Sequence, residues 1–199
     1  MAARQVVGID EVGRGCLAGP VVAAAVVLGS KHGILGLNDS KCLSAKKRLQ
    51  LSEQVRKRAL MWAIGRAEAC EIDLINIHNA SLLAMRRAFL ALKFDVSVWV
   101  KVDGKYYPDI STPGEAIVKG DQLVDEIAAA SIVAKVARDR EMILLDRLCP
   151  GYGFSQHKGY PSRLHLECIQ HLGVTCFHRR SYRPVREYLQ QHKQIIEAR

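Results

Sequence analysis

Four acidic residues stand where the chain passes from a predicted strand into a turn that contains glycine. Asp10 and Glu11 lie where the first predicted strand runs into Gly13-Arg14-Gly15, Asp103 closes a later strand, and Asp121 follows another. Carboxylates that share one place repel each other unless a cation lies among them, and hard oxygen ligands suit Mg²⁺ or Mn²⁺. Two such ions about 4 Å apart activate water and stabilise the leaving oxygen in phosphodiester hydrolysis. The pattern therefore favours a metal-dependent phosphodiesterase site.

A second interpretation of the same residues stays open. A strand-terminal aspartate commonly caps N–H groups of its own turn, and each acid taken singly fits that structural role. Neighbours on a regular strand also face opposite sides of the sheet, so Asp10 and Glu11 share one site only if the strand bends. Gly13 and Gly15 permit such a bend.

Three further features fit either nucleic-acid binding or an ordinary solvated surface. The segment Gly13-Arg14-Gly15 exposes backbone N–H groups that a phosphate or ribose can approach, or it is a glycine-rich turn with a solvated arginine. Basic loops with aromatic residues at 157–161 and 178–183 suit stacking and phosphate pairing. A polar stripe on the helix predicted over 122–148 tracks a phosphate backbone or faces solvent; it contains Ser131, Lys135, Arg138 and Asp139.

Composition and charge narrow the class of protein. The 199 residues are 49% hydrophobic and 25% charged, and the net charge of +9 indicates a polyanionic partner such as nucleic acid or an anionic membrane. The longest apolar run, at 21–28, is far shorter than the ~20 residues of a bilayer-spanning helix, and the first residues lack the apolar stretch of a signal peptide. Six cysteines form no Cys-x-x-Cys pair, which indicates reduced thiols and a cytoplasmic location.

Hydrophobic periodicity predicts an α/β fold. Strands are expected over 6–10, 21–28, 61–70, 96–102 and 116–119. Helices are expected over 45–60 with Ser44 as N-cap, 71–78, 81–93, 122–148, 163–172 and 185–197. Short connections between the early strands favour a mixed sheet over a purely parallel one. Residues 1–150 are expected to form a catalytic body and residues 151–199 a small, basic helical region.

Several motifs together resemble the ribonuclease HII family, the type 2 ribonucleases H. Their order and spacing agree from about Val7 to Val185, nearly the whole chain, and the long helical run among them is highly specific. The motifs are Asp10-Glu11-Val12-Gly13-Arg14-Gly15, Leu17-Ala18-Gly19-Pro20, Asn38-Asp39-Ser40-Lys41, Asp103-Gly104, Lys119-Gly120-Asp121, the run from Ile127 to Asp139, Gly151-Tyr152-Gly153 and His157-Lys158-Gly159-Tyr160-Pro161.

The resemblance implies a ribonuclease H-like fold, with a central mixed β-sheet flanked by helices and a small C-terminal helical subdomain. It also implies cleavage of RNA in RNA–DNA hybrids, and cleavage on the 5′ side of single ribonucleotides embedded in duplex DNA, leaving 3′-hydroxyl and 5′-phosphate ends. By the same resemblance, a two-ion site for Mg²⁺ or Mn²⁺ is formed by Asp10, Glu11, Asp103 and Asp121.

Substrate contacts follow from the resemblance as well. It implies that Gly13, Arg14 and Gly15 contact the ribonucleotide 2′-hydroxyl and the RNA-to-DNA junction. It implies that Tyr160 stacks on the sugar of the following deoxynucleotide. It further implies that phosphates are held by Lys41, Ser131 and Lys135. Two positions depart from the family pattern: Cys16 stands where proline is frequent, and Arg183 stands where a small residue is usual.

The expected partners are therefore RNA–DNA hybrids and ribonucleotide-containing duplex DNA, with no membrane and a monomeric protein. No clamp-binding motif is recognisable beyond about Tyr188, which leaves a sliding-clamp partner unassigned. Two alternatives stay open at this point. One is another nuclease of the same fold with clustered carboxylates, such as a resolvase or an integrase. The other is a non-catalytic nucleic-acid-binding module explained by the positive charge alone.

Overall fold

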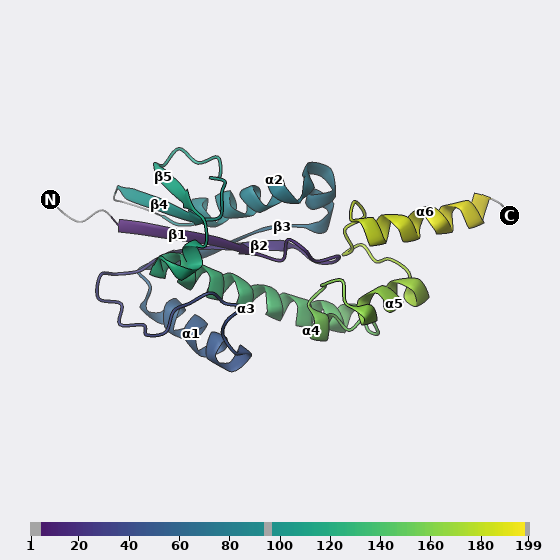
Figure 1. Cartoon of the computed structure of the whole chain (residues 1–199), viewed down its shortest axis with the longest axis horizontal. Helices are drawn as coiled ribbons and strands as arrows, with labels where there is room; N and C mark the ends of the chain where they lie inside the picture. The colour runs from purple at the N-terminus through teal and green to yellow at the C-terminus, as the bar shows by residue number, and fades with distance from the viewer. Residues whose placement is uncertain (1–4, 94–96, 198–199) are drawn as a thin grey trace. The chain divides into compact units, whose positions relative to one another are not determined.

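A five-stranded mixed sheet (Figure 1) carries three of the four acidic residues singled out above, Asp10 and Glu11 in its first strand and Asp103 in its fourth. The computed structural model describes residues 5–93 and 97–197. The strand order is β3-β2-β1-β4-β5. The strands are β1 (Gln5–Val12), β2 (Val21–Val27), β3 (Met61–Ala67), β4 (Val98–Asp103) and β5 (Gly114–Ile117). Since β1 runs antiparallel to β2 and parallel to β4, the predicted mixed sheet and the α/β class are confirmed.

The parallel pairing of β1 with β4 decides where the first acids meet. Ile9 is the register partner of Val102, so Asp10 and Asp103 each follow that pair by one residue. The carboxyl ends of parallel neighbours lie at the same edge of a sheet. Two acids that are far apart in the sequence are therefore brought to adjacent strand ends.

Helices cover both faces of this sheet. On one face, α1 (Ala45–Arg58) packs with the first half of α3 (Asp125–Leu148), and their apolar side chains form one core with Ala24 and Val26 of β2. Ser44 caps α1 as predicted, because its hydroxyl accepts the Lys47 N–H at 3.3 Å. The second half of α2 (Ala69–Leu90) lies on the opposite face of the sheet, as Figure 1 shows.

Two strand glycines allow these helices to approach closely. A Cβ on Gly8 would lie 2.1 Å from the Glu126 carbonyl carbon of α3, and a Cβ on Gly65 would lie 2.1 Å from the Ala84 carbonyl oxygen of α2. Any larger residue would force helix and strand apart. The contact at Gly8 also fixes how closely α3 lies to β1, at a point two residues before Asp10.

Several predicted boundaries are wrong by a few residues. The strand expected over 61–70 ends at Ala67, because α2 begins at Ala69. The two helices expected between 71 and 93 are joined in α2, with a non-helical break at Asn76 (φ 65°, ψ 166°). The last strand covers Gly114–Ile117, and a 3₁₀ helix, η1 (Gly120–Gln122), precedes α3. Residue 96, where one predicted strand begins, lies outside the described residues.

The chain forms two compact units, each built from separate segments. The first contains the strand that ends at Val12 together with Val22–Arg66 and Ser81–Ala137. The second contains Gly13–Val21, Ala67–Ala80 and the chain from Arg138 onward. The second unit includes α4 (Phe154–His157), α5 (Arg163–Leu172) and α6 (Arg183–Glu197). The division expected at residue 150 stays a prediction.

A chain of buried histidines crosses the interior of the second unit. His178 and His165 are 1% and 0% exposed. The Thr175 N–H donates to His178 Nδ1 at 3.0 Å, so the His178 proton resides on Nε2 and is donated to His165 Nε2 at 3.1 Å. His165 Nδ1–H then donates to the Tyr160 carbonyl at 3.0 Å. Each ring is satisfied only in its neutral form.

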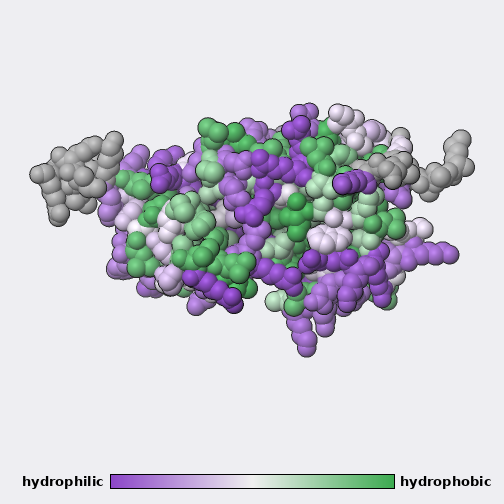
Figure 2. Space-filling model, turned by 180° about the vertical axis from the view of Figure 1, so that it is seen from behind, coloured by the Kyte–Doolittle hydropathy of each residue, from purple (hydrophilic) through white to green (hydrophobic). Residues whose placement is uncertain are grey.

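Within residues 5–93 and 97–197, none of the helices combines the length and the apolar character that a membrane crossing requires. Figure 2 shows hydrophilic and hydrophobic residues interspersed on the face of the molecule that it presents.

We expect the histidine chain to make stability depend on pH. Burial lowers the pKa of both His165 and His178 to about 4, against 6.5 for an unperturbed imidazole. Between pH 6.5 and 4 the unfolded chain therefore binds protons that the native chain does not. The free energy of unfolding should fall as pH falls, by about 1.4 kcal/mol per pH unit for each histidine. Urea unfolding at a series of pH values measures this slope.

His178→Gln is the variant that isolates the histidine contribution, because acidic groups with raised pKa values change stability with the opposite sign over the same range. The variant should show a shallower loss of stability below pH 6.5 than the parent protein. An identical pH dependence of the two proteins would contradict the assignment of the slope to the histidines.

Candidate active site

Asp10 is the buried centre of a group of carboxylates in the first unit. Its side chain is 6% exposed and accepts the Glu11 N–H at 2.7 Å. Burial raises the pKa of Asp10 well above its usual value, and the negative charges of Glu11 and Asp103 raise it further. A hydrogen bond from Ser131 of α3 acts against this rise. The strand thus holds a carboxylate in a place where its negative charge is unfavourable.

Glu11 is the next residue on β1. Because side chains alternate along a strand, its side chain lies on the face of the sheet opposite to that of Asp10. β1 stays paired with β2 as far as Val12, whose partner is Val22, so the pairing is not interrupted between the two acids. The charge of Glu11 nevertheless raises the pKa of Asp10. The two carboxylates are close enough to interact even without a break in the strand.

Asp103 and Asp121 approach each other through a turn. Asp103 ends β4, and its Oδ1 accepts the Gly120 N–H at 2.7 Å. Lys119 has a left-handed backbone (φ 58°), which redirects the chain into η1. Asp121, in η1, is 7% exposed, and burial followed by the charges of Asp103 and Asp39 raises its pKa.

A further acid, Asp39, belongs to this group and was not singled out as a ligand from the sequence. It is 9% exposed and hydrogen-bonded to Asp121. Its Oδ1 also accepts the Lys41 N–H at 2.9 Å, which closes a tight turn in this segment. The signal available in the sequence was its place beside Lys41 in a motif of the resembled family.

Two other predicted residues lie at the same group of acids, and a third lies one helical turn away. Partial burial alone would lower the pKa of Lys41. The negative charges of the surrounding carboxylates outweigh this effect and raise the pKa; they belong to Asp39, Asp10, Asp121 and Asp103. Ser131 is 5% exposed; besides its bond to Asp10, its hydroxyl is hydrogen-bonded to the Ser40 hydroxyl at 3.0 Å. Lys135 follows Ser131 by one turn of α3 and is half-buried.

The donor chemistry of this group fits a divalent cation. Carboxylate oxygens are the ligands that Mg²⁺ and Mn²⁺ prefer. Burial, and then the charges of neighbouring carboxylates, raise the pKa values of Asp10 and Asp121, and a bound cation would oppose both effects. In the described part of the chain, however, no three His, Cys, Asp or Glu side chains are already arranged as ligands of one ion. One oxygen of Asp103 is held by the Gly120 N–H. A carboxylate oxygen that accepts one N–H keeps a lone pair, so Asp103 can still contribute to a cation site.

The remaining predicted contacts lie in the second unit. Arg14 and Gly15 are exposed, whereas Gly13 is buried with φ +94°. Tyr160 is 40% exposed, and its side chain is hydrogen-bonded to Cys16; burial raises the pKa of its phenol, and Cys16 raises it further. The structure thus places Tyr160 beside the residue that follows Gly15.

Three basic residues expected at the surface, either against nucleic acid or in solvent, are buried, and that expectation is wrong for them. Arg138, from the polar stripe, is 0% exposed, as is Arg179 from the loop at 178–183, and His178 is 1% exposed. Charge and sequence position cannot reveal burial of this kind. The side chains of both arginines bond to backbone carbonyls of the protein instead.

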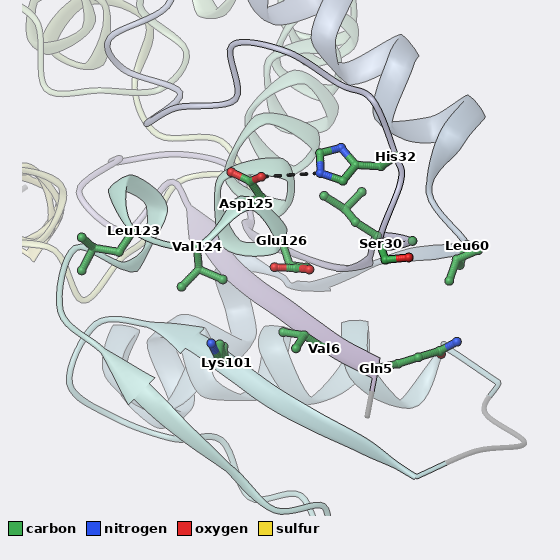
Figure 3. A pocket seen from close by; sticks show the side chains of 12 residues that line it. Gln5, Val6, Ser30, His32, Leu60, Lys101, Leu123, Val124, Asp125 and Glu126 are labelled. Atoms are coloured by element: carbon green, nitrogen blue, oxygen red, sulfur yellow. Dashed lines mark ion pairs between the residues drawn. The ribbon is translucent and has the colours of Figure 1, made fainter. Parts of the chain in front are cut away.

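One cavity of about 830 Å³ lies elsewhere in the first unit and does not include the acidic group (Figure 3). Figure 3 shows His32 facing Asp125, with an ion pair at 3.5 Å. Lys101 and Glu126 also line this cavity, together with Gln5 and Val6 from the start of β1. The acids at the carboxyl ends of β1 and β4 are therefore a separate feature.

Comparison with known proteins decides the family. A family model described as Ribonuclease HII matches residues 7–185. The chain belongs to the ribonuclease HII family. The ribonuclease HII of Methylococcus capsulatus is 57% identical over 181 residues, which cover 91% of this chain and 93% of that protein. The resemblance found in the sequence motifs is thereby confirmed, and the protein is a nuclease of the hydrolase class.

Solved structures agree with this ribonuclease HII fold. The ribonuclease H2 of Pyrococcus horikoshii OT3 matches with a TM-score of 0.78 and 24% identity, covering 96% of this chain and 99% of that chain. The ribonuclease HII of Archaeoglobus fulgidus, solved in complex with PCNA, matches with a TM-score of 0.74 and 27% identity over 90% and 95% of the two chains. Family membership favours ribonuclease H endonuclease activity over both alternatives left open by the sequence.

The charge repulsion at Asp10 predicts an unusual stability change in this ribonuclease HII. Without divalent ions, Asp10→Asn should raise the midpoint of thermal unfolding, because it removes a buried negative charge next to Glu11 and Asp103. A gain of 1 kcal/mol corresponds to about 2–4 °C for a chain of this size. Scanning fluorimetry in EDTA and in Mg²⁺ measures the midpoints.

Saturating Mg²⁺ should stabilise the parent protein more than Asp10→Asn, since a bound ligand stabilises the folded state. The exposed Asp109→Asn is the matched control and should behave like the parent protein in both conditions. A loss of stability in EDTA for Asp10→Asn would show that the carboxylate is not repelled by its neighbours.

Proposed function

We propose that the chain is an endonuclease that cleaves RNA in RNA–DNA hybrids and on the 5′ side of single ribonucleotides in duplex DNA. The products would carry 3′-hydroxyl and 5′-phosphate ends. The observation that supports this function best is the meeting of Asp10, Asp103 and Asp121 from separate segments of the chain, where burial and then the charge of Asp103 raise the pKa values of both Asp10 and Asp121. Together with family membership, it indicates a place where divalent cations are needed.

The proposed ligands are Asp10, Glu11, Asp103 and Asp121, and Asp39 joins them through its bond to Asp121. A pair of Mg²⁺ or Mn²⁺ ions, when bound, would activate the attacking water and stabilise the departing 3′-oxygen. Ser131 holds the carboxylate of Asp10 by a hydrogen bond and so limits its rotation. Lys41 brings a positive charge whose raised pKa keeps it protonated beside the acids.

Substrate recognition is assigned to backbone and side-chain groups with different chemistry. Gly13, Arg14 and Gly15 would contact the 2′-hydroxyl at the RNA-to-DNA junction, since that hydroxyl distinguishes RNA from DNA. The half-exposed ring of Tyr160 would stack on the sugar of the following deoxynucleotide. Phosphates would be held by Lys41, Ser131 and Lys135, and the net charge of +9 would favour their approach.

Other aspects of the biology stay predictions. A monomeric state and a cytoplasmic location are expected from the sequence. The PCNA complex belongs to the Archaeoglobus fulgidus relative. We propose no sliding-clamp partner for this chain.

Cleavage of defined duplexes tests the proposed reaction. With Mg²⁺, the protein should cut a DNA duplex that contains one ribonucleotide, and an RNA–DNA hybrid, but neither the all-deoxy duplex nor a four-way junction. Asp121→Asn should lower the rate by at least about 100-fold, because metal charge stabilisation is worth several kcal/mol and 1.36 kcal/mol is a factor of ten. End-labelled products mapped on a sequencing gel give the cut site.

The exposed Asp109→Asn should retain the parent rate and serves as the control for loss of one negative charge. Equal cleavage of the all-deoxy duplex would exclude recognition of a 2′-hydroxyl. A parent-like rate for Asp121→Asn would remove that residue from the metal site.

Tyr160 provides a separate test of substrate recognition. Tyr160→Ala should reduce the preference for the single-ribonucleotide duplex over a continuous hybrid, measured as a ratio of kcat/KM values. By analogy with base stacking on aromatic rings, worth about 1–3 kcal/mol by alanine substitution, we expect roughly a 5- to 150-fold change. Tyr160→Phe keeps the ring and should keep the preference, and an unchanged ratio in Tyr160→Ala would argue against stacking.

A further inference from the structure

Two arginine side chains are completely buried against the segment Arg14–Pro20 of the second unit. Arg138 comes from the second half of α3, and Arg179 precedes α6. Both are 0% exposed. The family resemblance assigned no role to either, and the surface role expected for them from charge alone is wrong.

Arg138 donates to three backbone carbonyls. Its Nε donates to the Pro20 carbonyl at 2.9 Å, its Nη2 to the Ala18 carbonyl at 3.1 Å and its Nη1 to the Lys158 carbonyl at 2.8 Å. The side chain also lies directly against Gly13, where an added Cβ would be 2.2 Å from Arg138 Nε. Arg138 thus joins both ends of the Gly13–Pro20 stretch to the loop that carries Tyr160.

Arg179 holds the same segment from other atoms. Its Nε and Nη2 donate to the Gly19 carbonyl at 3.0 and 2.9 Å, and its Nη1 donates to the Arg14 carbonyl at 2.9 Å. Nη1 also donates to the Tyr182 hydroxyl at 3.0 Å, and that hydroxyl donates to the Arg14 carbonyl. The Arg14 carbonyl therefore accepts two hydrogen bonds from the protein interior.

The acceptors in this arrangement are neutral oxygens, whereas the donors carry full positive charges. Burial lowers the pKa of Arg179, and Arg138 adds to that effect although Tyr182 and Cys16 oppose it; a guanidinium nevertheless stays protonated in proteins. Apolar side chains of similar volume would fill the space without the cost of desolvating two cations. Stability alone is therefore a poor reason for this arrangement.

The geometry has a direct consequence for the exposed part of the loop. In a planar trans peptide the carbonyl and the following N–H point in opposite directions. Since the Arg14 carbonyl is held inside by Arg179 and Tyr182, the N–H of Gly15 points outward. Arg14 and Gly15 are exposed, and a Cβ on Gly15 would meet nothing within 4 Å, so an acceptor oxygen can approach that N–H.

We propose that Arg138 and Arg179 are positioning residues that fix the Gly13–Gly15 backbone for recognition of the ribonucleotide. Arg179 holds the Arg14 carbonyl inward and so presents the Gly15 N–H to the nucleic acid, while Arg138 holds the Ala18 and Pro20 carbonyls of the same loop. Both arginines add a fixed positive potential behind the loop. This inference rests on the proposed function, in which the loop contacts the 2′-hydroxyl.

Arg179→Lys is the informative variant, because lysine keeps the charge but cannot reach the Gly19 and Arg14 carbonyls with a planar fork. Affinities are measured by fluorescence anisotropy in EDTA for two duplexes that differ in one 2′-hydroxyl, together with kcat and KM in Mg²⁺. We expect the affinity ratio of the two duplexes to fall about 10-fold and KM to rise by a similar factor, with kcat changed less.

Two further variants separate positioning from folding and from charge. Tyr182→Phe removes one hydroxyl at the Arg14 carbonyl and should lower the same ratio by a smaller factor, even if Arg179→Lys does not fold. Arg163→Gln removes one positive charge from an exposed ion pair with Glu167 and should leave the ratio unchanged. A merely structural role would lower the unfolding midpoint of Arg179→Lys and leave the affinity ratio of the folded protein intact, which would overturn the inference.

The two binding duplexes also distinguish this inference from the proposed function. A parent protein that cleaves the ribonucleotide duplex, with an Arg179→Lys variant that keeps the affinity ratio, would overturn the positioning role alone. A parent protein that prefers the ribonucleotide duplex without cleaving it, and loses that preference in Arg179→Lys, would support positioning and overturn the nuclease. A parent protein with neither cleavage nor preference would overturn both.

Discussion

The crowding of negative charge at the carboxyl ends of β1 and β4 is the constraint on which the first unit depends. Burial keeps Asp10 away from water while Glu11 and Asp103 repel its charge, and Asp121 is disfavoured in the same way beside Asp39. Such an arrangement costs folding stability unless a cation is bound. Parallel pairing of β1 with β4, the turn at Lys119 and the closeness of α3 at Gly8 all maintain it.

Much of this organisation could be predicted from local patterns. Alternating valines and a β-branched run define β4 and β2, and Ser44 marks the start of α1. The acids at strand ends were found because turns with glycine follow or precede them. The break in α2 was expected at residues 79–80 and lies at Asn76, and β5 was expected two residues beyond Gly114–Ile117, since tertiary contacts decide such boundaries.

The sequence did not indicate which polar and charged side chains are buried. From the sequence, Arg138 and Arg179 were expected at the surface, because arginine is rarely buried completely. Both are in fact buried, and the backbone carbonyls that accept their hydrogen bonds explain why. Asp39 closes a tight turn through its bond to the Lys41 N–H, and it also bonds to Asp121, which its place in the sequence did not indicate. Both cases require contacts between residues that are distant in the chain, which periodicity and spacing do not encode.

The second unit anchors its loop through main-chain atoms, and this has an evolutionary consequence. Arg138 and Arg179 bind carbonyl oxygens, which every amino acid supplies, so the two arginines themselves place no demand on the side chains of the loop. The side chains of Cys16, Leu17 and Ala18 are nevertheless buried, so packing limits substitution at these positions while the backbone shape of the loop is inherited from the two arginines.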